Sequence, residues 1–118
     1  MCVKQTGDCG VVDGDLSLET FEALEPALPH AESLVLNGIG EPLLNPLLEE
    51  FVRRAKRLMP AGSWVGFQSN GQLLDEARAL SLVEAGLDWI CLSLDSVCPD
   101  TFRKLREGGE VNDLERAL

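Results

Sequence analysis

The sequence has few cysteines and no long apolar run. Four cysteines in 118 residues, unevenly spaced, are too few for a disulfide-built scaffold. Because they include no C-x-x-C pair, we expect no self-contained four-thiolate metal site. No run approaches the ~20 apolar residues that a membrane span requires. The first twenty positions are rich in charged and polar residues, unlike a signal peptide. We therefore expect a cytoplasmic protein with no membrane partner.

Positive charge is also scarce. Ten Lys and Arg residues face twenty Asp and Glu residues, so the formal net charge is −10. Counterion release on nucleic acid needs a basic surface, and an anionic membrane repels an acidic protein. The sequence therefore argues against both partners. With 45% hydrophobic and 25% charged residues, it has the composition of one globular domain.

Short apolar runs alternate with helical patterns along the chain. The expected strands cover residues 33–37, 64–68 and 89–94, and they start about 31 and 25 residues apart. The runs lack a clean polar–apolar alternation, which is typical of parallel strands covered on both faces. Helices are expected before, between and after these strands, at residues 17–25, 45–59, 75–86 and from 112 onward. This rhythm predicts an α/β fold with parallel strands alternating with helices, either a (β/α) barrel or a doubly wound sheet.

Several local predictions follow from these patterns. Asn45 caps the second helix and Pro46 takes its first position, where a missing N–H costs nothing. The third helix is capped by Asp75, stops at Gly86, and has Ala77, Leu80 and Val83 as its apolar stripe. Two tryptophans and one cysteine in the strands are expected to pack against helices or in the core; they are Trp64, Trp89 and Cys91.

Both ends of the chain look cut. The first 16 residues contain no strand, and the helix that Asn112 caps would stop within about two turns. A parallel sheet of three strands leaves both of its edges exposed. We therefore expect a partial (β/α) barrel, part of a larger one, with possible self-association through the sheet edges.

In parallel α/β folds, ligands bind at the carboxyl ends of the strands. The first run is followed by a turn in which Gly38 and Gly40 let the backbone approach a ligand. Glu41 comes next, and Pro42 biases it toward an extended backbone. A carboxylate beside free backbone carbonyls suits an ammonium group, whereas the plainer interpretation is a tight turn with a solvated glutamate.

The other two strand ends carry weaker signals. Asn70 and Gly71 form an ordinary turn dipeptide. Ser93 and Asp95 alternate to the same side of the third run, where a hydroxyl and a carboxylate could bind ribose hydroxyls. Their alternative role is to cap the following helix. Taken together, the three turns fit a small polar ligand with an ammonium group and hydroxyls.

These segments resemble motifs of the radical S-adenosylmethionine (SAM) superfamily, in the branch of peptide- and cofactor-maturing enzymes related to the molybdenum-cofactor cyclase. Residues 36–46, which include Gly-Ile-Gly-Glu-Pro, are similar to its Gly-Gly-Glu-Pro segment, with Ile39 between the glycines. Ser69-Asn70-Gly71 is similar to its Ser/Thr-Asn-Gly, and residues 92–96 to its fourth strand. Residues 102–109 are similar to its Arg-Gly-Gly segment.

The resemblance implies cofactors and site residues. The family's C-x3-C-x2-C signature holds a 4Fe-4S cluster, and Cys2 matches its third cysteine, so the first two would precede residue 1. SAM would then be bound by Gly38, Gly40, Glu41, Pro42, Asn70, Ser93 and Asp95. Residues 1–118 would be the end of the cluster loop and strands two to four of a (β/α)6 barrel.

The resemblance also implies an activity for the parent protein. Such an enzyme, an oxidoreductase or maturase, cleaves SAM reductively to a 5′-deoxyadenosyl radical that acts on a small-molecule or peptide substrate. The fragment alone is expected to be inactive, because one thiolate cannot replace three. One alternative is a non-catalytic α/β module that binds SAM or a partner. The other, a doubly wound nucleotide-binding domain, is disfavoured because no strand is followed by Gly-x-Gly-x-x-Gly or a P-loop.

Overall fold

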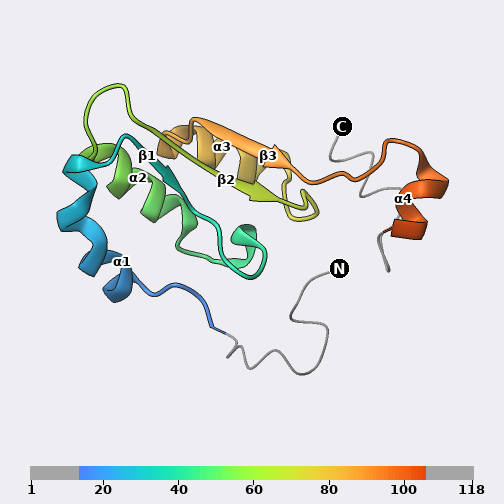
Figure 1. Cartoon of the computed structure of the whole chain (residues 1–118), viewed down its shortest axis with the longest axis horizontal. Coiled ribbons are helices and arrows are strands. Elements are labelled where there is room, and N and C mark those ends of the chain that lie inside the picture. The colour runs from blue at the N-terminus through green and yellow to red at the C-terminus, as the bar shows by residue number, and fades with distance from the viewer. Residues whose placement is uncertain (1–13, 106–118) are drawn as a thin grey trace.

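The computed structural model describes residues 14–105, in which helices and parallel strands alternate (Figure 1). Helices α1, α2, α3 and α4 span Leu18–Leu24, Leu48–Leu58, Glu76–Ala85 and Pro99–Leu105, and strands β1, β2 and β3 span Ser33–Val35, Trp64–Ser69 and Trp89–Leu92. Two 3-10 helices, η2 at Glu25–His30 and η3 at Pro42–Leu44, complete the order. The predicted alternation is confirmed. Helix α4 was not predicted, and the helix expected after Asn112 lies outside the described residues.

The three strands form one parallel sheet in the order β1-β2-β3. Ser33 pairs with Trp64, and Gly66 pairs with Trp89, so each strand lies beside its neighbour in sequence. Helices α2 and α3 cover the same face of the sheet (Figure 1). A doubly wound sheet reverses its strand order and has helices on both faces. The fold is therefore α/β, a partial (β/α) barrel.

The core lies between the sheet and its helices. Phe21 of α1 stacks on Phe51 of α2 with ring centroids 4.6 Å apart, and both side chains are buried. Val65 and Phe67 of β2 are fully buried on the face that α2 and α3 cover. Burial of such side chains contributes about 1.5–3 kcal/mol each. This layer fixes the register of β2 and therefore the position of the strand ends.

No element of residues 14–105 covers the opposite face of the sheet, which we call the open face, and this corrects three expectations. Trp64 and Trp89 do not pack on helices; their rings contact each other on this face, 5.6 Å apart and tilted by 58°. Cys91 is exposed there rather than in the core. The indole of Trp89 lies over Gly66, where a Cβ atom would come within 2.3 Å of the ring. The lack of alternation in the sequence came from these large apolar residues, not from helices on both faces.

Two predictions about helix ends and faces were wrong. Helix α2 begins after Leu47, not at Pro46, because Asn45 ends η3 and its Oδ1 instead accepts a hydrogen bond from the Leu47 N–H. Helix α3 has its predicted Asp75 cap and its Gly86 stop at φ 93°. However, its buried residues are Leu82 and Ala85. The predicted stripe, Ala77, Leu80 and Val83, is exposed.

Charged side chains connect α2 to the sheet at the amino ends of β2 and β3. Lys56 of α2 forms an ion pair with Asp88, with Nζ 2.9 Å from Oδ2, and Asp88 Oδ2 also accepts the Val65 N–H at 2.7 Å. Partial burial raises the pKa of Asp88, but the hydrogen bonds from Lys56 and Val65 outweigh it, and the pKa lies below its ordinary value. Residues 14–105 contain no helix of the length and apolar character that crossing a membrane requires.

Candidate functional site

The ends of β1 and β2 are joined through one carboxylate. Glu41 Oε1 accepts the Ser69 hydroxyl at 2.6 Å and the Leu43 N–H at 3.2 Å, and Oε2 accepts the Asn70 N–H at 2.9 Å. We call this carboxylate with its three donors the Glu41 clasp. Hydrogen bonds to a charged acceptor are worth about 1.5–3 kcal/mol each. The clasp therefore fixes the turn after β1 against the turn after β2.

The local sequence explains why Glu41 can reach across. Gly40 has φ 155°, and Glu41 is extended at φ −100° and ψ 116°, as expected for a residue before proline. Pro42 then starts η3, whose first N–H groups need an acceptor, and the Glu41 side chain supplies one. A Cβ atom on Gly38 would meet no atom within 4 Å, so the glycine turn is open to solvent.

The turn after β2 is stabilised by hydrogen bonds of a buried side chain, that of Ser69. Ser69 is only 2% exposed, donates to Glu41, and accepts the Gly71 N–H through its Oγ at 3.0 Å. Asn70 Oδ1 accepts the Gln72 N–H at 2.9 Å, so the side chain closes a turn on itself. Gly71 has φ 77°, a conformation that favours glycine. Asn70 thus contributes its backbone N–H to the clasp, while its side chain shapes the turn.

The end of β3 lies at the same carboxyl edge of the sheet, which we call the rim, and is hydrogen-bonded to the end of β2. The Ser93 N–H donates to Ser69 O at 2.9 Å, and Ser93 Oγ accepts a hydrogen bond from Gln68 Nε2 at 2.9 Å. Asp95 follows with φ 60°, the left-handed region that Asp tolerates better than most residues. The described tips of all three strands are therefore hydrogen-bonded at one edge of the sheet.

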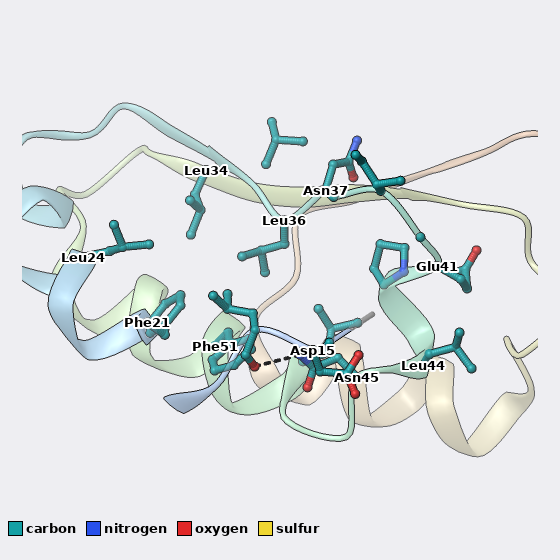
Figure 2. A pocket seen from close by; sticks show the side chains of 18 residues that line it. Asp15, Phe21, Leu24, Leu34, Leu36, Asn37, Glu41, Leu44, Asn45 and Phe51 are labelled. Atoms are coloured by element: carbon teal, nitrogen blue, oxygen red, sulfur yellow. Dashed lines mark hydrogen bonds between the residues drawn. The ribbon is translucent and has the colours of Figure 1, made fainter. Parts of the chain in front are cut away.

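The glycine turn also forms one wall of a pocket of about 340 Å³ (Figure 2). Apolar side chains from α1, β1 and α2 line its other end, among them Phe21, Leu34 and Phe51. Glu41 and Asn37 lie at the end nearer the strand tips. The backbone of residues 38–40 can thus be reached both from this pocket and from the rim.

Sequence reasoning placed Gly38, Gly40, Glu41 and Pro42 in one turn, and the structure brings this turn together with Asn70. It missed Ser69 as the closest donor to Glu41, although Ser69 belongs to the same Ser-Asn-Gly tripeptide. It also missed Asn37 and Gln68. Asn37 Oδ1 accepts the Gln68 N–H at 2.8 Å, a contact between strand neighbours that only the register reveals.

Metal-ligating residues are sparse in this part of the chain. Cys2 and Cys9 lie outside the described residues. Within residues 14–105, the described side chains form no group of three or more His, Cys, Asp or Glu residues that could hold a metal ion. Cys98 is a free, exposed thiol whose pKa is lowered by hydrogen bonds from Thr101.

The fold is a partial (β/α) barrel, and a glycine turn and polar groups lie at the carboxyl ends of its strands. Barrel proteins of this class bind their ligands at that end. The model of the radical SAM superfamily matches residues 14–118, and the chain belongs to this family. The family's cofactors are SAM and a 4Fe-4S cluster. The resemblance stated from the motifs is therefore confirmed.

Similar proteins agree with this assignment. The chain is 33% identical over 97 residues to a tungsten-containing aldehyde ferredoxin oxidoreductase cofactor-modifying protein of Pyrococcus furiosus, covering 80% of this chain and 26% of that protein. It is 34% identical over 113 residues to a GTP 3′,8-cyclase of Pelotomaculum thermopropionicum, covering 93% and 34%. The chain thus spans about a quarter to a third of these relatives.

A solved structure resembles the fold. The crystal structure of BtrN in complex with AdoMet and 2-DOIA superposes with a TM-score of 0.64 at 22% identity. The match covers 89% of this chain and 44% of BtrN. This likeness supports the partial barrel, since the chain matches less than half of that structure.

Proposed function

We propose that residues 1–118 are the end of the cluster loop and strands two to four of a radical SAM barrel. The whole protein would be an oxidoreductase or maturase that cleaves SAM reductively and acts on a small-molecule or peptide substrate. The observation that carries this proposal is the Glu41 clasp. It joins the glycine turn and the Ser-Asn-Gly turn into one rigid rim at the carboxyl ends of the strands.

SAM is assigned to this rim by the chemistry of its groups. Its methionine ammonium needs acceptors, and the open turn at Gly38 and Gly40 offers backbone carbonyls beside the Glu41 carboxylate. Three protein donors already hold that carboxylate, so it contributes charge and shape while the turn contributes acceptors. Pro42 keeps the turn extended. Ser93 and Asp95, at the β3 tip, suit the ribose hydroxyls, and Asn70 lines the same rim.

Cys2 is assigned as one ligand of the 4Fe-4S cluster, by its position in the sequence. When bound and reduced, this cluster would supply the electron for the reductive cleavage of SAM to methionine and a 5′-deoxyadenosyl radical. The chain's own residues bind and orient SAM. Because such a cluster is sensitive to oxygen and cysteines are few, the proposal assigns the protein to the cytoplasm.

The first prediction concerns SAM binding. Glu41→Gln removes the negative charge and places an NH2 group against the Asn70 N–H or the Ser69 hydroxyl. We expect SAM affinity, measured by isothermal titration calorimetry, to fall about tenfold or more. The matched control is Glu76→Gln, an exposed glutamate on α3. Equal SAM affinity in wild type and Glu41→Gln would contradict the proposal.

The second prediction concerns the cluster. After anaerobic reconstitution, one cysteine of the required three should hold far fewer than four irons per chain, and we expect no 5′-deoxyadenosine. Iron counting and chromatography of the reaction with dithionite check this. A stable cluster of about four irons would contradict the assignment of the chain as a fragment.

A further inference from the structure

The carbonyl group at which η3 ends is bound by a side chain of α3. Arg78 Nη2 donates a hydrogen bond to Asn45 O, with 3.2 Å between the two atoms. Asn45 closes η3 and Glu41 opens it, so these two residues flank a helix of three residues, and both line the pocket in Figure 2. Arg78 therefore binds the segment after the glycine turn at the end opposite to the Glu41 clasp.

The position of Arg78 is itself fixed by α2. Its Nε lies 2.9 Å from Glu49 Oε1, in an ion pair whose geometry is not that of a hydrogen bond. The Ser81 hydroxyl donates to the same oxygen at 2.9 Å. The side chain of Glu49 is 12% exposed and that of Arg78 is 28% exposed, so salt and water screen this pair less than a fully exposed one. The planar guanidinium is thus held at Nε while Nη2 reaches the Asn45 carbonyl.

Apolar packing holds η3 in a different way. Leu43 is 4% exposed and belongs to one apolar cluster with side chains of α2, β2 and α3. Apolar contacts are not directional, so they keep η3 against the core without fixing its rotation. The hydrogen bonds at its two ends are directional, and they involve Glu41 at one end and Arg78 at the other. The stability and the orientation of this segment therefore depend on different groups.

Asn45 extends the contact to the chain before α1. Its Nδ2 donates to Leu16 O at 3.0 Å, and its Oδ1 accepts the Leu47 N–H at 2.8 Å. Leu16 lies in the sequence between α1 and Cys2, the residue that we assign to the cluster. The segment that precedes α1 and the segment that follows the glycine turn thus meet at Asn45, and Arg78 binds Asn45 from a third element.

A purely structural tie between α2 and α3 would need only the charge of Arg78. A lysine at this position would place its ammonium about where Cζ of Arg78 lies, close enough to pair with Glu49 but one bond short of Nη2. The hydrogen bond to Asn45 O therefore needs the second arm of the guanidinium. Because the two contacts need different groups, substitutions can separate them.

We propose that Arg78 is a positioning residue for the SAM rim: through Asn45 and η3, it fixes the orientation of Glu41 and of the glycine turn to which the SAM ammonium binds. Arg78 acts through η3 and not by contact with SAM. This role deepens the proposed function and rests on it, because it concerns how the same rim keeps its shape.

The test compares Arg78→Lys with two control variants of the same cluster in the full chain. Arg78→Lys keeps the positive charge and loses Nη2. Glu49→Gln removes the charge of the ion pair and leaves Nη2 on Asn45 O, and Ser81→Ala removes the hydroxyl that binds Glu49. SAM affinity is measured by isothermal titration calorimetry, and the free energy of unfolding by urea denaturation.

We expect Arg78→Lys to weaken SAM binding about three- to tenfold, and both controls to change it by about twofold or less. A positioning role predicts that SAM affinity falls with the loss of the Asn45 contact and does not follow the loss of stability. A purely structural role would instead make the two losses run in parallel across the three variants.

NMR of the 15N-labelled chain without SAM gives a second readout. The backbone amides of Leu43 and Asn70 donate to Glu41, so their signals report the geometry of the clasp. These signals should shift more in Arg78→Lys than in either control. The amide of Gly62, in the turn between α2 and β2, is the internal reference and should not shift.

In a wild-type chain that binds SAM, two results would overturn the role of Arg78: unchanged SAM affinity in Arg78→Lys, or an equal loss of affinity in Arg78→Lys and Glu49→Gln. A wild-type chain that does not bind SAM would contradict the proposed function instead. The NMR readout then still decides the role of Arg78, because shifted Leu43 and Asn70 amides in Arg78→Lys support its effect on the turn and unshifted ones exclude it.

Discussion

Glu41 has a structural role that the sequence alone did not reveal. As a solvated turn glutamate it would make no fixed contacts, yet its two oxygens accept three hydrogen bonds from Leu43, Ser69 and Asn70. It is therefore part of the framework of the rim. The ammonium-binding role proposed from the sequence then rests on the neighbouring backbone carbonyls together with the charge of Glu41.

At Gly66 the lack of a side chain decides the packing of the open face. A Cβ atom there would lie 2.3 Å from the Trp89 indole, far inside van der Waals contact. We expect Gly66→Ala to destabilise the protein by about 1–3 kcal/mol, because Trp89 must move. Urea denaturation followed by circular dichroism measures the change in the free energy of unfolding.

The matched control for this prediction is Gly38→Ala, where a Cβ atom meets nothing within 4 Å. The cost of Gly66→Ala should also shrink in a Trp89→Ala background, which tests whether the two residues are coupled. Two outcomes would contradict this explanation: a similar loss of stability in Gly66→Ala and Gly38→Ala, or an unchanged loss for Gly66→Ala in the Trp89→Ala background. Either would show that backbone propensity, and not the indole, causes the loss.

At the scale of elements, helix α3 shows the limit of a periodic pattern. Residues 77, 80 and 83 are spaced by three, which fits an apolar stripe, but so does the pair Leu82 and Ala85. The structure buries the second set: Leu82 is 2% exposed and packs in one cluster with Phe67 and Leu48. Leu80 and Val83 of the predicted stripe remain 58% and 68% exposed. The contact with β2 and α2 selects the face.

This assignment gives a direct mutational prediction. Leu82→Ala should cost about 2–5 kcal/mol, because it leaves a cavity in the core. Leu80→Ala removes the same atoms from an exposed site on the same helix and should change stability by about 0.5 kcal/mol or less. Thermal and urea unfolding of both variants measure the difference. A larger effect at Leu80 would restore the stripe predicted from the sequence.

At the scale of the whole molecule, Asp88 links α2 to the start of the sheet through Lys56 and Val65. Its pKa is lowered in the folded protein, so its ionised form favours folding above the ordinary carboxyl pKa of about 4. This contribution is lost as pH falls through the lower, folded-state value. The stability of the protein should therefore fall in that acidic range.

Asp88→Asn should destabilise the protein at pH 7 by about 1 kcal/mol, since the pair is partly exposed and screened. The gap from wild type should narrow below about pH 4. Urea denaturation at pH 7, 5 and 3 checks this. Asp75→Asn is the control, because Asn caps a helix as well as Asp does. A gap that does not depend on pH would refute the ionic contribution.

Within the described residues, β1 is an edge strand of the sheet, and this is a second property at the scale of the whole molecule. Val35 is 44% exposed on this strand, and an unpaired edge can pair with another chain. We expect the sedimentation coefficient to rise with protein concentration, and Val35→Lys to suppress this rise. Val83→Lys, the same change on α3, should still associate. A monomeric wild type, or suppression by Val83→Lys alone, would exclude association through the edge.

The sequence by itself determined the elements and the family. Apolar runs, Asp75, Gly86 and the turn residues predicted the alternation of strands and helices, and the Gly-Ile-Gly-Glu-Pro and Ser-Asn-Gly segments identified the radical SAM superfamily. These features are local, because each depends on residues close together in the chain.

Only the tertiary structure decided which groups meet. The contact of Glu41 with Ser69, the Asn37 and Gln68 amides, the open face with Trp64 and Trp89, and the buried face of α3 all join residues separated by many positions. They follow from strand register and from competition between faces for burial. Strand register and the choice of buried face cannot be predicted from the spacing of residues along a single element.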